Sequence, residues 1–248
     1  KISDLGRVCD IFFSADIAII DAMLIPEHAS WSIPFTNNEM CIVFHDGSQG
    51  ADKINSDNWT HILSQPNTTV ARCDPNSAPA GYRTVQLFQL AEAHYQEPGL
   101  SERLLPLHME FIRPQEPELF ALLETRAVDY AFAYRTTAEQ RGYRFVSLPD
   151  AINLSNPEFA AQYATASVEV SGSAPGKTVT EAGKPMVYGL TIPASAKDPE
   201  LAAAFLDFAF LEEQGRSIWA QHHQPLSEQL NKDLASVLNA APKELAQT

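Results

Sequence analysis

The sequence predicts an α/β fold organised in two lobes. Apolar runs of strand length alternate with amphipathic helical segments along most of the chain, which is typical of sheets covered by helices. A chain of 248 residues can form one large domain or two lobes, since domains commonly hold about 100–150 residues. Hydrophobic residues make up 45% and charged residues 19%, an ordinary globular composition. We expect two mixed, mostly parallel sheets flanked by helices.

The strands are predicted at short apolar runs bounded by polar or turn residues, the pattern of a buried strand. These runs are residues 8–13, 40–44, 69–73, 128–134, 145–148 and 186–192. The stretch 153–183 has the weakest pattern and is rich in Ser, Gly and Pro near its middle. We interpret it as a mobile surface hairpin or loop.

Two helix starts have clear chemical signals. Asp16 precedes an apolar-periodic segment, and Asp198 precedes Pro199, so each aspartate can act as an N-cap and the proline suits the first helical position. Further helices are expected at residues 58–63, 82–95 and 118–123. In the helix after Asp198, the spacing predicts a core face made of Leu201, Phe205, Phe208 and Leu211.

The charge balance excludes some classes of partner. The formal net charge is −14 and no run of Lys and Arg is present, so a nucleic-acid partner is not expected. An anion site in such a chain must use local charges and dipoles. No apolar stretch reaches 18 residues, so we expect no membrane insertion. The three cysteines form no CxxC pair, and no catalytic or nucleotide-binding motif occurs, so neither an enzyme nor a cofactor is predicted.

The most informative local feature is the start of the helix near residue 79. The first amides of a helix lack intrahelical partners and, with the helix dipole, favour an anion. Ala80 and Gly81 have little or no side chain, so an anion can reach their amides. Arg83 follows closely, where the dipole disfavours a cation. We therefore expect an anion near Arg83, with an acidic side chain favoured over a ligand.

Two further residues lie where strands and helices meet. Glu116 stands at a predicted helix start, where it is either a capping or solvated carboxylate or a ligand-binding group. Tyr134 ends a predicted strand, at the edge where α/β proteins bind ligands. It is either a half-buried structural tyrosine or part of a site.

Several segments together resemble one family. They are residues 10–16, 34–39, 54–59, 79–83, 128–135 and 183–193. In this order they resemble the molybdate/tungstate-binding periplasmic proteins of ABC importers, in particular the tungstate-type branch. The resemblance implies a periplasmic-binding-protein type II (Venus flytrap) fold, a small oxyanion ligand bound between two lobes, and a membrane permease as partner. It also implies a monomer that is periplasmic or extracellular. Whether an absent N-terminal segment anchors it to the membrane is left open.

The resemblance also implies lobe boundaries and site residues. Lobe one would comprise residues 1–45 and 145–248, and lobe two residues 46–144. The oxyanion would contact the amide at Ala80, the carboxylate of Glu116 and the hydroxyl of Tyr134, with Glu116 as a possible ligand to the metal centre of the metalate.

Three departures from the family pattern leave alternatives open. The first strand and two serine-bearing loops of the family are not found in this sequence, so lobe one would lack its usual first strand. Ala78 stands where the tungstate-type branch has an aspartate, and the segment 102–113 is shorter. A cation-binding protein of the same fold, using Glu116, Tyr134 and Tyr82, is the first alternative. The effector-binding domain of a transcription regulator is the second.

Overall fold

The computed structural model describes residues 2–172 and 176–244, and its chain divides into two compact units. The first unit comprises residues 1–37 and 186–248, and the second residues 38–185. The chain therefore passes from one unit to the other twice, after Asn37 and after Pro185. Each unit is described below by itself.

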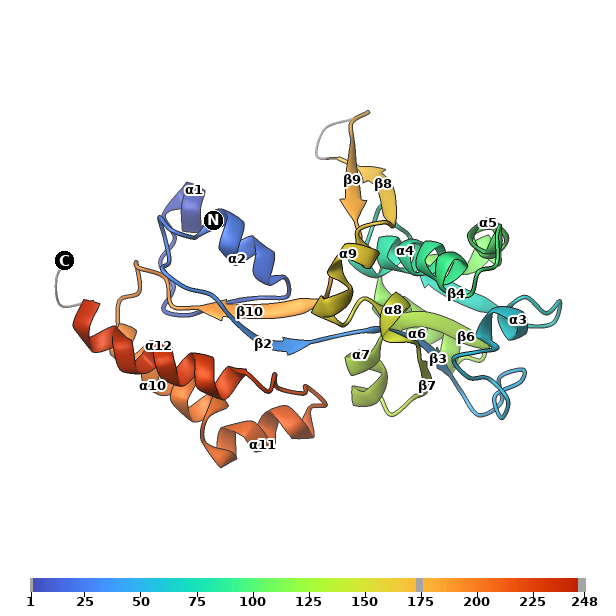
Figure 1. Ribbon diagram of the computed structural model, residues 1–248. Helices are drawn as coiled ribbons and strands as arrows, with labels where there is room; N and C mark the ends of the chain where they lie inside the picture. The colour runs from blue at the N-terminus through green and yellow to red at the C-terminus, as the bar shows by residue number, and fades with distance from the viewer. Residues whose placement is uncertain (1, 173–175, 245–248) are drawn as a thin grey trace. The chain divides into compact units, whose positions relative to one another are not determined.

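The first unit contains a three-stranded antiparallel sheet with helices packed on it (Figure 1). Its strand order is β1-β10-β2, with the bounds Phe12–Ser14, Val187–Thr191 and Ile33–Asn37. Its helices are α1 (Ile2–Leu5), α2 (Ile17–Met23), α10 (Pro199–Phe210), α11 (Glu213–Gln221) and α12 (Leu230–Glu244). Both predicted caps are confirmed, since an Asp16 oxygen accepts from the Ala18 amide and Asp198 accepts from Leu201.

The predicted core face of α10 is wrong for three of its four residues, whereas the fourth, Leu211, packs against the core. The exposed fractions of Leu201, Phe205 and Phe208 are 66%, 50% and 38%. The helix instead buries Ala202, Leu206, Ala209 and Phe210. Because α10 carries apolar residues on several faces, helical spacing alone fits both sets, and contact with the sheet decides between them.

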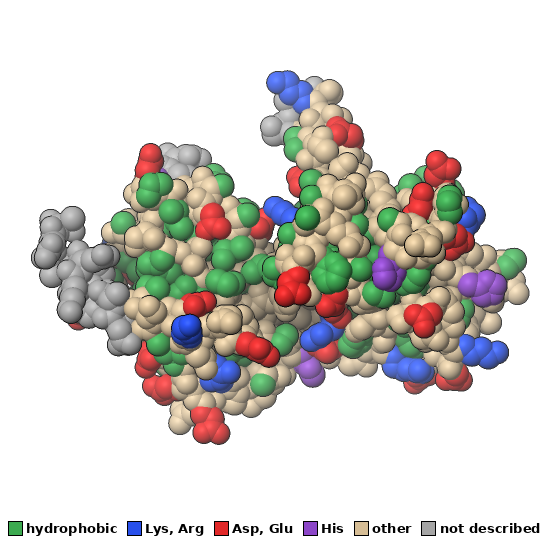
Figure 2. All heavy atoms as spheres, viewed as in Figure 1, with side chains coloured by type: hydrophobic (Ala, Val, Ile, Leu, Met, Phe, Trp, Pro, Cys, Tyr) green, Lys and Arg blue, Asp and Glu red, His purple; other side chains and the backbone are tan. Residues whose placement is uncertain are grey.

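The N-terminal part of the first unit also differs from the prediction. The buried strand expected at residues 8–13 is limited to β1, which begins at Phe12, and Val8 and Phe13 are 48% and 41% exposed. Most of the large hydrophobic side chains that remain exposed belong to this unit, and Figure 2 shows hydrophobic groups on its visible face.

The second unit is built on a five-stranded sheet with the order β5-β4-β6-β3-β7. The strand bounds are Ile112–Arg113, Val70–Cys73, Tyr130–Tyr134, Met40–Phe44 and Arg144–Ser147. The helices are α3 (Trp59–Leu63), α4 (Pro79–His94), α5 (Leu100–Leu104), α6 (Glu116–Glu124), α7 (Arg135–Gln140), α8 (Asp150–Asn153) and α9 (Ala160–Tyr163). Two 3₁₀ turns, Met109–Phe111 and Pro157–Phe159, complete the unit.

A mixed sheet is confirmed for the second unit, but the sheet of the first unit is antiparallel, and the expectation of mostly parallel pairing is wrong. Only β4–β5 and β4–β6 pair in parallel among the described residues, whereas β3 pairs antiparallel with both β6 and β7. Strands β4 to β7 do run in one direction, as the strand–helix alternation indicates. The insertion of β3 between β6 and β7 makes two of the pairings antiparallel, and the sequence pattern carries no information about that insertion.

The unit boundaries differ from those expected at 45/46 and 144/145. Strands β3 and β7 pair with each other inside the second unit, so this unit begins before β3. It also contains the hairpin of β8 (Ser167–Ser171) and β9 (Thr178–Ala182), within the stretch expected to form a hairpin or loop. Residues 173–175 of that stretch lie outside the described residues.

Candidate functional site

Three strand ends of the second unit meet at one edge of its sheet. Strands β4, β5 and β6 are parallel, so their last residues, Cys73, Arg113 and Tyr134, lie at the same edge. Helices α4 and α6 begin a few residues after two of these ends. Ligands of α/β proteins commonly bind outside the carboxyl ends of strands. The structure therefore brings the predicted residues Ala80, Gly81, Glu116 and Tyr134 to a single region.

The turn before α4 is held by Asp74. Its carboxylate accepts from the Asn76 amide at 2.9 Å and from the Ser77 hydroxyl at 3.1 Å. Its carbonyl accepts from the amides of Ser77 and Ala78. Ala78 is the N-cap of α4 and provides no side-chain cap. The first amides of α4 consequently lack a capping side chain.

Gly81 has a packing role that the sequence did not reveal. A Cβ at this position would lie 2.3 Å from the carbonyl oxygen of Asp74, so only glycine allows this close approach of helix and turn. The Gly81 amide donates to the Ala78 carbonyl at 2.9 Å and is already used. Ala80 is 3% exposed, with no hydrogen bond from its amide found within the described residues. Of the two predicted amides, only that of Ala80 has no hydrogen-bond acceptor within the described residues.

Arg83 of α4 contacts Tyr134 of β6. The guanidinium Nη1 donates to the Tyr134 hydroxyl oxygen at 2.6 Å. The guanidinium carbon lies 5.6 Å from the Tyr134 ring centroid and 5.8 Å from that of Tyr82, within the range of cation–π attraction. The expected acidic partner of Arg83 is not found, since no carboxylate among residues 2–172 and 176–244 lies within 4.0 Å of it.

Glu116 is engaged with the backbone of the same strand end. Its Oε1 accepts from the Tyr134 amide at 2.8 Å, and its Oε2 accepts from the Thr137 hydroxyl at 3.3 Å. Because Tyr134 is the N-cap of α7, the carboxylate lies where the helix dipole favours negative charge. Burial raises the pKa of the Glu116 carboxyl, and these hydrogen bonds oppose that rise in part.

The Tyr134 phenol stays protonated at neutral pH. Burial raises its pKa to about 12, although the neighbouring Arg83 charge acts in the opposite direction. A neutral phenol offers one donor and two acceptor lone pairs. One lone pair receives the Arg83 bond, so the hydroxyl hydrogen can be donated to another group.

A second polar cluster at this sheet edge was missed by the sequence analysis. Glu39, next to β3, accepts from Ser147 at 3.0 Å and from Asn153 at 3.2 Å. Arg135 lies 3.8 Å from Glu39 and 3.5 Å from Glu139. Burial raises the pKa of Glu39, and Arg135 partly offsets this. The spacing of Arg135 and Glu139 by four residues was the only local signal; the contact with Glu39 depends on the sheet order.

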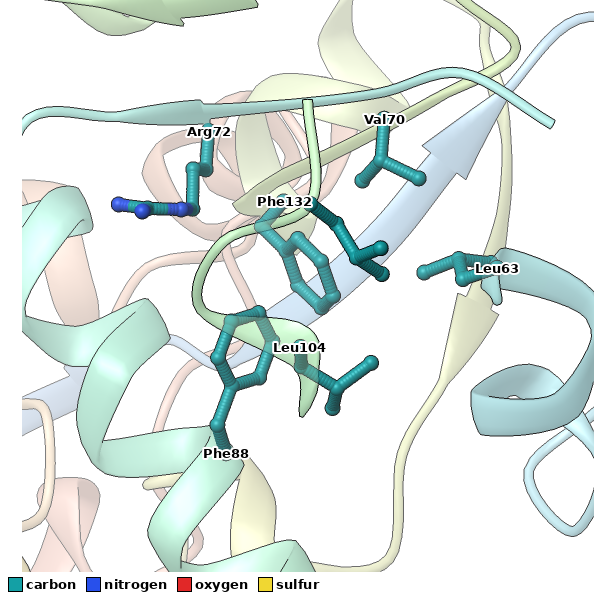
Figure 3. A pocket seen from close by; sticks show the side chains of 7 residues that line it. Leu63, Val70, Arg72, Phe88, Leu104 and Phe132 are labelled. Atoms are coloured by element: carbon teal, nitrogen blue, oxygen red, sulfur yellow. The ribbon is translucent and has the colours of Figure 1, made fainter. Parts of the chain in front are cut away.

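One small cavity lies in the core of the second unit. It has a volume of about 10 Å³, which is room for about one water molecule. In Figure 3 the apolar side chains point toward one another, and the Arg72 guanidinium points away from them. Arg72 is 8% exposed and donates from Nη2 to the Leu105 carbonyl at 2.9 Å. This cavity is too small for an oxyanion.

Metal-binding and membrane-spanning features were also sought. Within the described ranges, no group of three or more His, Cys, Asp or Glu side chains is arranged to hold a metal ion. No helix in the same part of the chain has the length and apolar character needed to cross a bilayer. Cys41 and Cys73 are buried in the second unit, whereas Cys9 is only partly buried and lies outside any strand.

The two units, each a sheet with helices packed on it, define a periplasmic-binding-protein type II fold. The periplasmic molybdate-binding protein of Azotobacter vinelandii shares this fold with a TM-score of 0.53 and 14% identity, over 90% of this chain and 80% of that protein. The chain matches the family of bacterial extracellular solute-binding proteins over residues 4–223, and it belongs to that family.

Two relatives illustrate the family. A solute-binding protein of Petrotoga mobilis is 41% identical over 99% of this chain and 75% of its own length. The molybdate/tungstate-binding protein WtpA of Pyrococcus abyssi is 33% identical over 90% of this chain and 70% of its own length. The predicted family resemblance and fold class are thus confirmed.

Proposed function

We propose that this protein is the solute-binding component of an ABC importer and that its ligand is a tetrahedral oxyanion, molybdate or tungstate. Membership of the extracellular solute-binding family and similarity to the WtpA proteins of two archaea support the proposal. The observation that carries it is the contact of Arg83 with Tyr134, because it gathers a positive charge and a free hydroxyl hydrogen beside a helix start.

Each predicted site residue has a distinct role in this proposal. The Ala80 amide and the Tyr134 hydroxyl donate hydrogen bonds to the oxyanion. Gly81 keeps α4 close to the turn that precedes it, which sets the position of the Ala80 amide. In this proposal Glu116 holds the β6–α7 junction, where each of its oxygens accepts a hydrogen bond, and it does not coordinate the metal of the metalate. The oxyanion remains four-coordinate.

A cation-binding function is disfavoured by the same contacts. A cation coordinated by Tyr134 would lie close to the Arg83 guanidinium, which donates to the same phenol oxygen. Two like charges at about 4 Å repel each other by about 1–4 kcal/mol in partly solvated surroundings.

The remaining parts of the proposal concern the cellular role. The protein acts outside the cytoplasmic membrane, in the periplasm or at the cell surface, and delivers the oxyanion to a membrane permease. It acts as a monomer, needs no cofactor and catalyses no reaction. Size-exclusion chromatography with light scattering tests the monomer, and co-purification with the permease tests the partner.

Calorimetric titration with tungstate, molybdate and sulfate tests the ligand. We expect binding of the two larger metalates in preference to sulfate. Replacing Tyr134 by Phe should weaken metalate binding about tenfold or more, since a hydrogen bond to a charged group contributes about 1.5–3 kcal/mol. Tyr143→Phe, which removes a phenolic hydroxyl elsewhere in the unit, is the matched control. A folded protein that gives no heat with either metalate refutes the proposal.

A further inference from the structure

Arg83 occupies a position that is electrostatically unfavourable unless an anion is near. It is the fifth residue of α4, close to the N-terminus of the helix, where the helix dipole disfavours a cation. The ion pairs formed by the described residues involve other arginines and leave Arg83 without a carboxylate. An alanine N-cap adds no negative charge at this helix start.

The orientation of Arg83 is nevertheless well defined. The hydrogen bond to Tyr134 joins α4 to the end of β6, across 51 positions of sequence. The flanking rings of Tyr82 and Tyr134 lie at similar distances of 5.8 and 5.6 Å from the guanidinium carbon. The charge is therefore held by aromatic surfaces and a phenol, none of which neutralises it.

The bond between Arg83 and Tyr134 has one possible direction. A guanidinium has donors only, so the phenol oxygen must be the acceptor. The hydroxyl hydrogen is then turned away from Arg83, and the neighbouring positive charge makes that hydrogen a stronger donor. Within residues 2–172 and 176–244, no protein acceptor of this hydrogen is found.

We propose that Arg83 is a positioning and specificity-determining residue, which orients the Tyr134 hydroxyl toward the ligand and makes the site prefer tetrahedral dianions to tetrahedral monoanions of similar size. This inference rests on the proposed oxyanion-binding function of the same site. The orienting effect acts on any oxyanion, whereas attraction by the Arg83 charge is proportional to the charge of the ligand. The two contributions can therefore be separated with ligands of different charge.

Tungstate and perrhenate are suitable probes, because both are tetrahedral and of similar size but carry two charges and one charge. Titration calorimetry with both anions should be applied to the intact protein and to the variants Arg83→Met, Arg83→Lys and Tyr134→Phe. Arg103→Met removes an equal charge from an exposed position of the same unit and is the matched control. Urea denaturation of each variant establishes that it is folded.

We expect the intact protein to bind tungstate more tightly than perrhenate. Arg83→Met should weaken tungstate binding at least tenfold and perrhenate binding several-fold less, so that the preference for the dianion shrinks. Arg83→Lys should keep the preference, because it keeps the charge, while losing affinity for both anions. Tyr134→Phe should weaken the binding of both anions equally. Arg83→Met should have a smaller effect on affinity in the Tyr134→Phe background than in the intact protein. Arg103→Met should leave both affinities unchanged.

The outcomes separate this inference from the proposed function. If the intact protein binds tungstate but Arg83→Met leaves the tungstate-to-perrhenate affinity ratio unchanged, only the role of Arg83 is overturned. A loss of the dianion preference in Arg83→Lys as large as that in Arg83→Met would also overturn it, since the preference would then not follow the charge. Absence of binding by the intact, folded protein overturns the proposed function and this inference together.

Discussion

Replacing Glu116 by Gln tests whether this carboxylate binds the ligand or stabilises the fold. The substitution keeps the shape and removes the charge. The amide oxygen of Gln can still accept from Tyr134, and the Thr137 hydroxyl can turn to accept from the new amide group. A charged acceptor contributes about 1.5–3 kcal/mol and a neutral one about 0.5–1.5 kcal/mol per bond. The weaker hydrogen bonds of Gln lower the stability, but the variant no longer buries a charge, which raises it. The net change in the free energy of unfolding should therefore be within about 1 kcal/mol.

The pH dependence of this stability change has a definite sign. Burial raises the folded-state pKa of Glu116 above its ordinary value. The contribution of this group to stability is therefore complete below the unfolded-state pKa, and it is lost as pH rises through the folded-state pKa. Gln does not titrate, so the free energy of unfolding of the Glu116→Gln variant, relative to that of the intact protein, should increase over that pH range and then level off. Urea denaturation at several pH values measures the difference.

Oxyanion binding gives the decisive result for Glu116. A carboxylate about 4 Å from an anion repels it by about 1–4 kcal/mol, so Glu116→Gln should leave metalate affinity unchanged or increase it. Glu118→Gln, an exposed carboxylate in the same helix turn, is the matched control. A tenfold or larger loss of metalate affinity in folded Glu116→Gln would falsify this reasoning and indicate coordination by the carboxylate.

Four further substitutions test the surroundings of the site and the first unit. Ala78→Asp should add a helix cap and raise the free energy of unfolding by about 1 kcal/mol. The new carboxylate should weaken the binding of a four-coordinate oxyanion. Tighter metalate binding in calorimetry would instead indicate that the carboxylate coordinates the metal. Gly81→Ala should lower stability by about 1–3 kcal/mol in urea denaturation, because its Cβ would meet the Asp74 carbonyl; an unchanged midpoint contradicts the close approach. Leu206→Ala should cost about 2–5 kcal/mol and Leu201→Ala less than about 0.5 kcal/mol; comparable losses would contradict the observed orientation of α10.

Features that depend on neighbouring residues could be predicted from the sequence. Asp16 and Asp198 cap their helices as predicted, because an N-cap bond needs only an oxygen and an amide two or three residues further on. The location of Ala80 and Tyr134 at one sheet edge also followed from local patterns, because both stand at junctions of strand and helix.

Features that depend on the order of the strands could not be predicted. The partner of Arg83 was expected to be an acidic side chain or a ligand, with the acid favoured, yet it is Tyr134 on another element. Similarly, the two acceptor bonds of Glu116 come from the β6–α7 junction, which adjoins α6 only because β6 lies next to β4. Residue types and their spacing along the chain therefore cannot predict either contact.

The strongly acidic composition is compatible with an anion site because charges act locally. Exposed charges are largely screened beyond about 8 Å at physiological salt, so most of the net charge of −14 has little influence at the edge of one sheet. What matters there is the local balance. Glu116 is tied by two hydrogen bonds and Glu39 faces Arg135, whereas Arg83 has no carboxylate partner within the described residues. Arg83 thus places a positive charge that no acid of the described residues pairs with beside the Tyr134 hydroxyl.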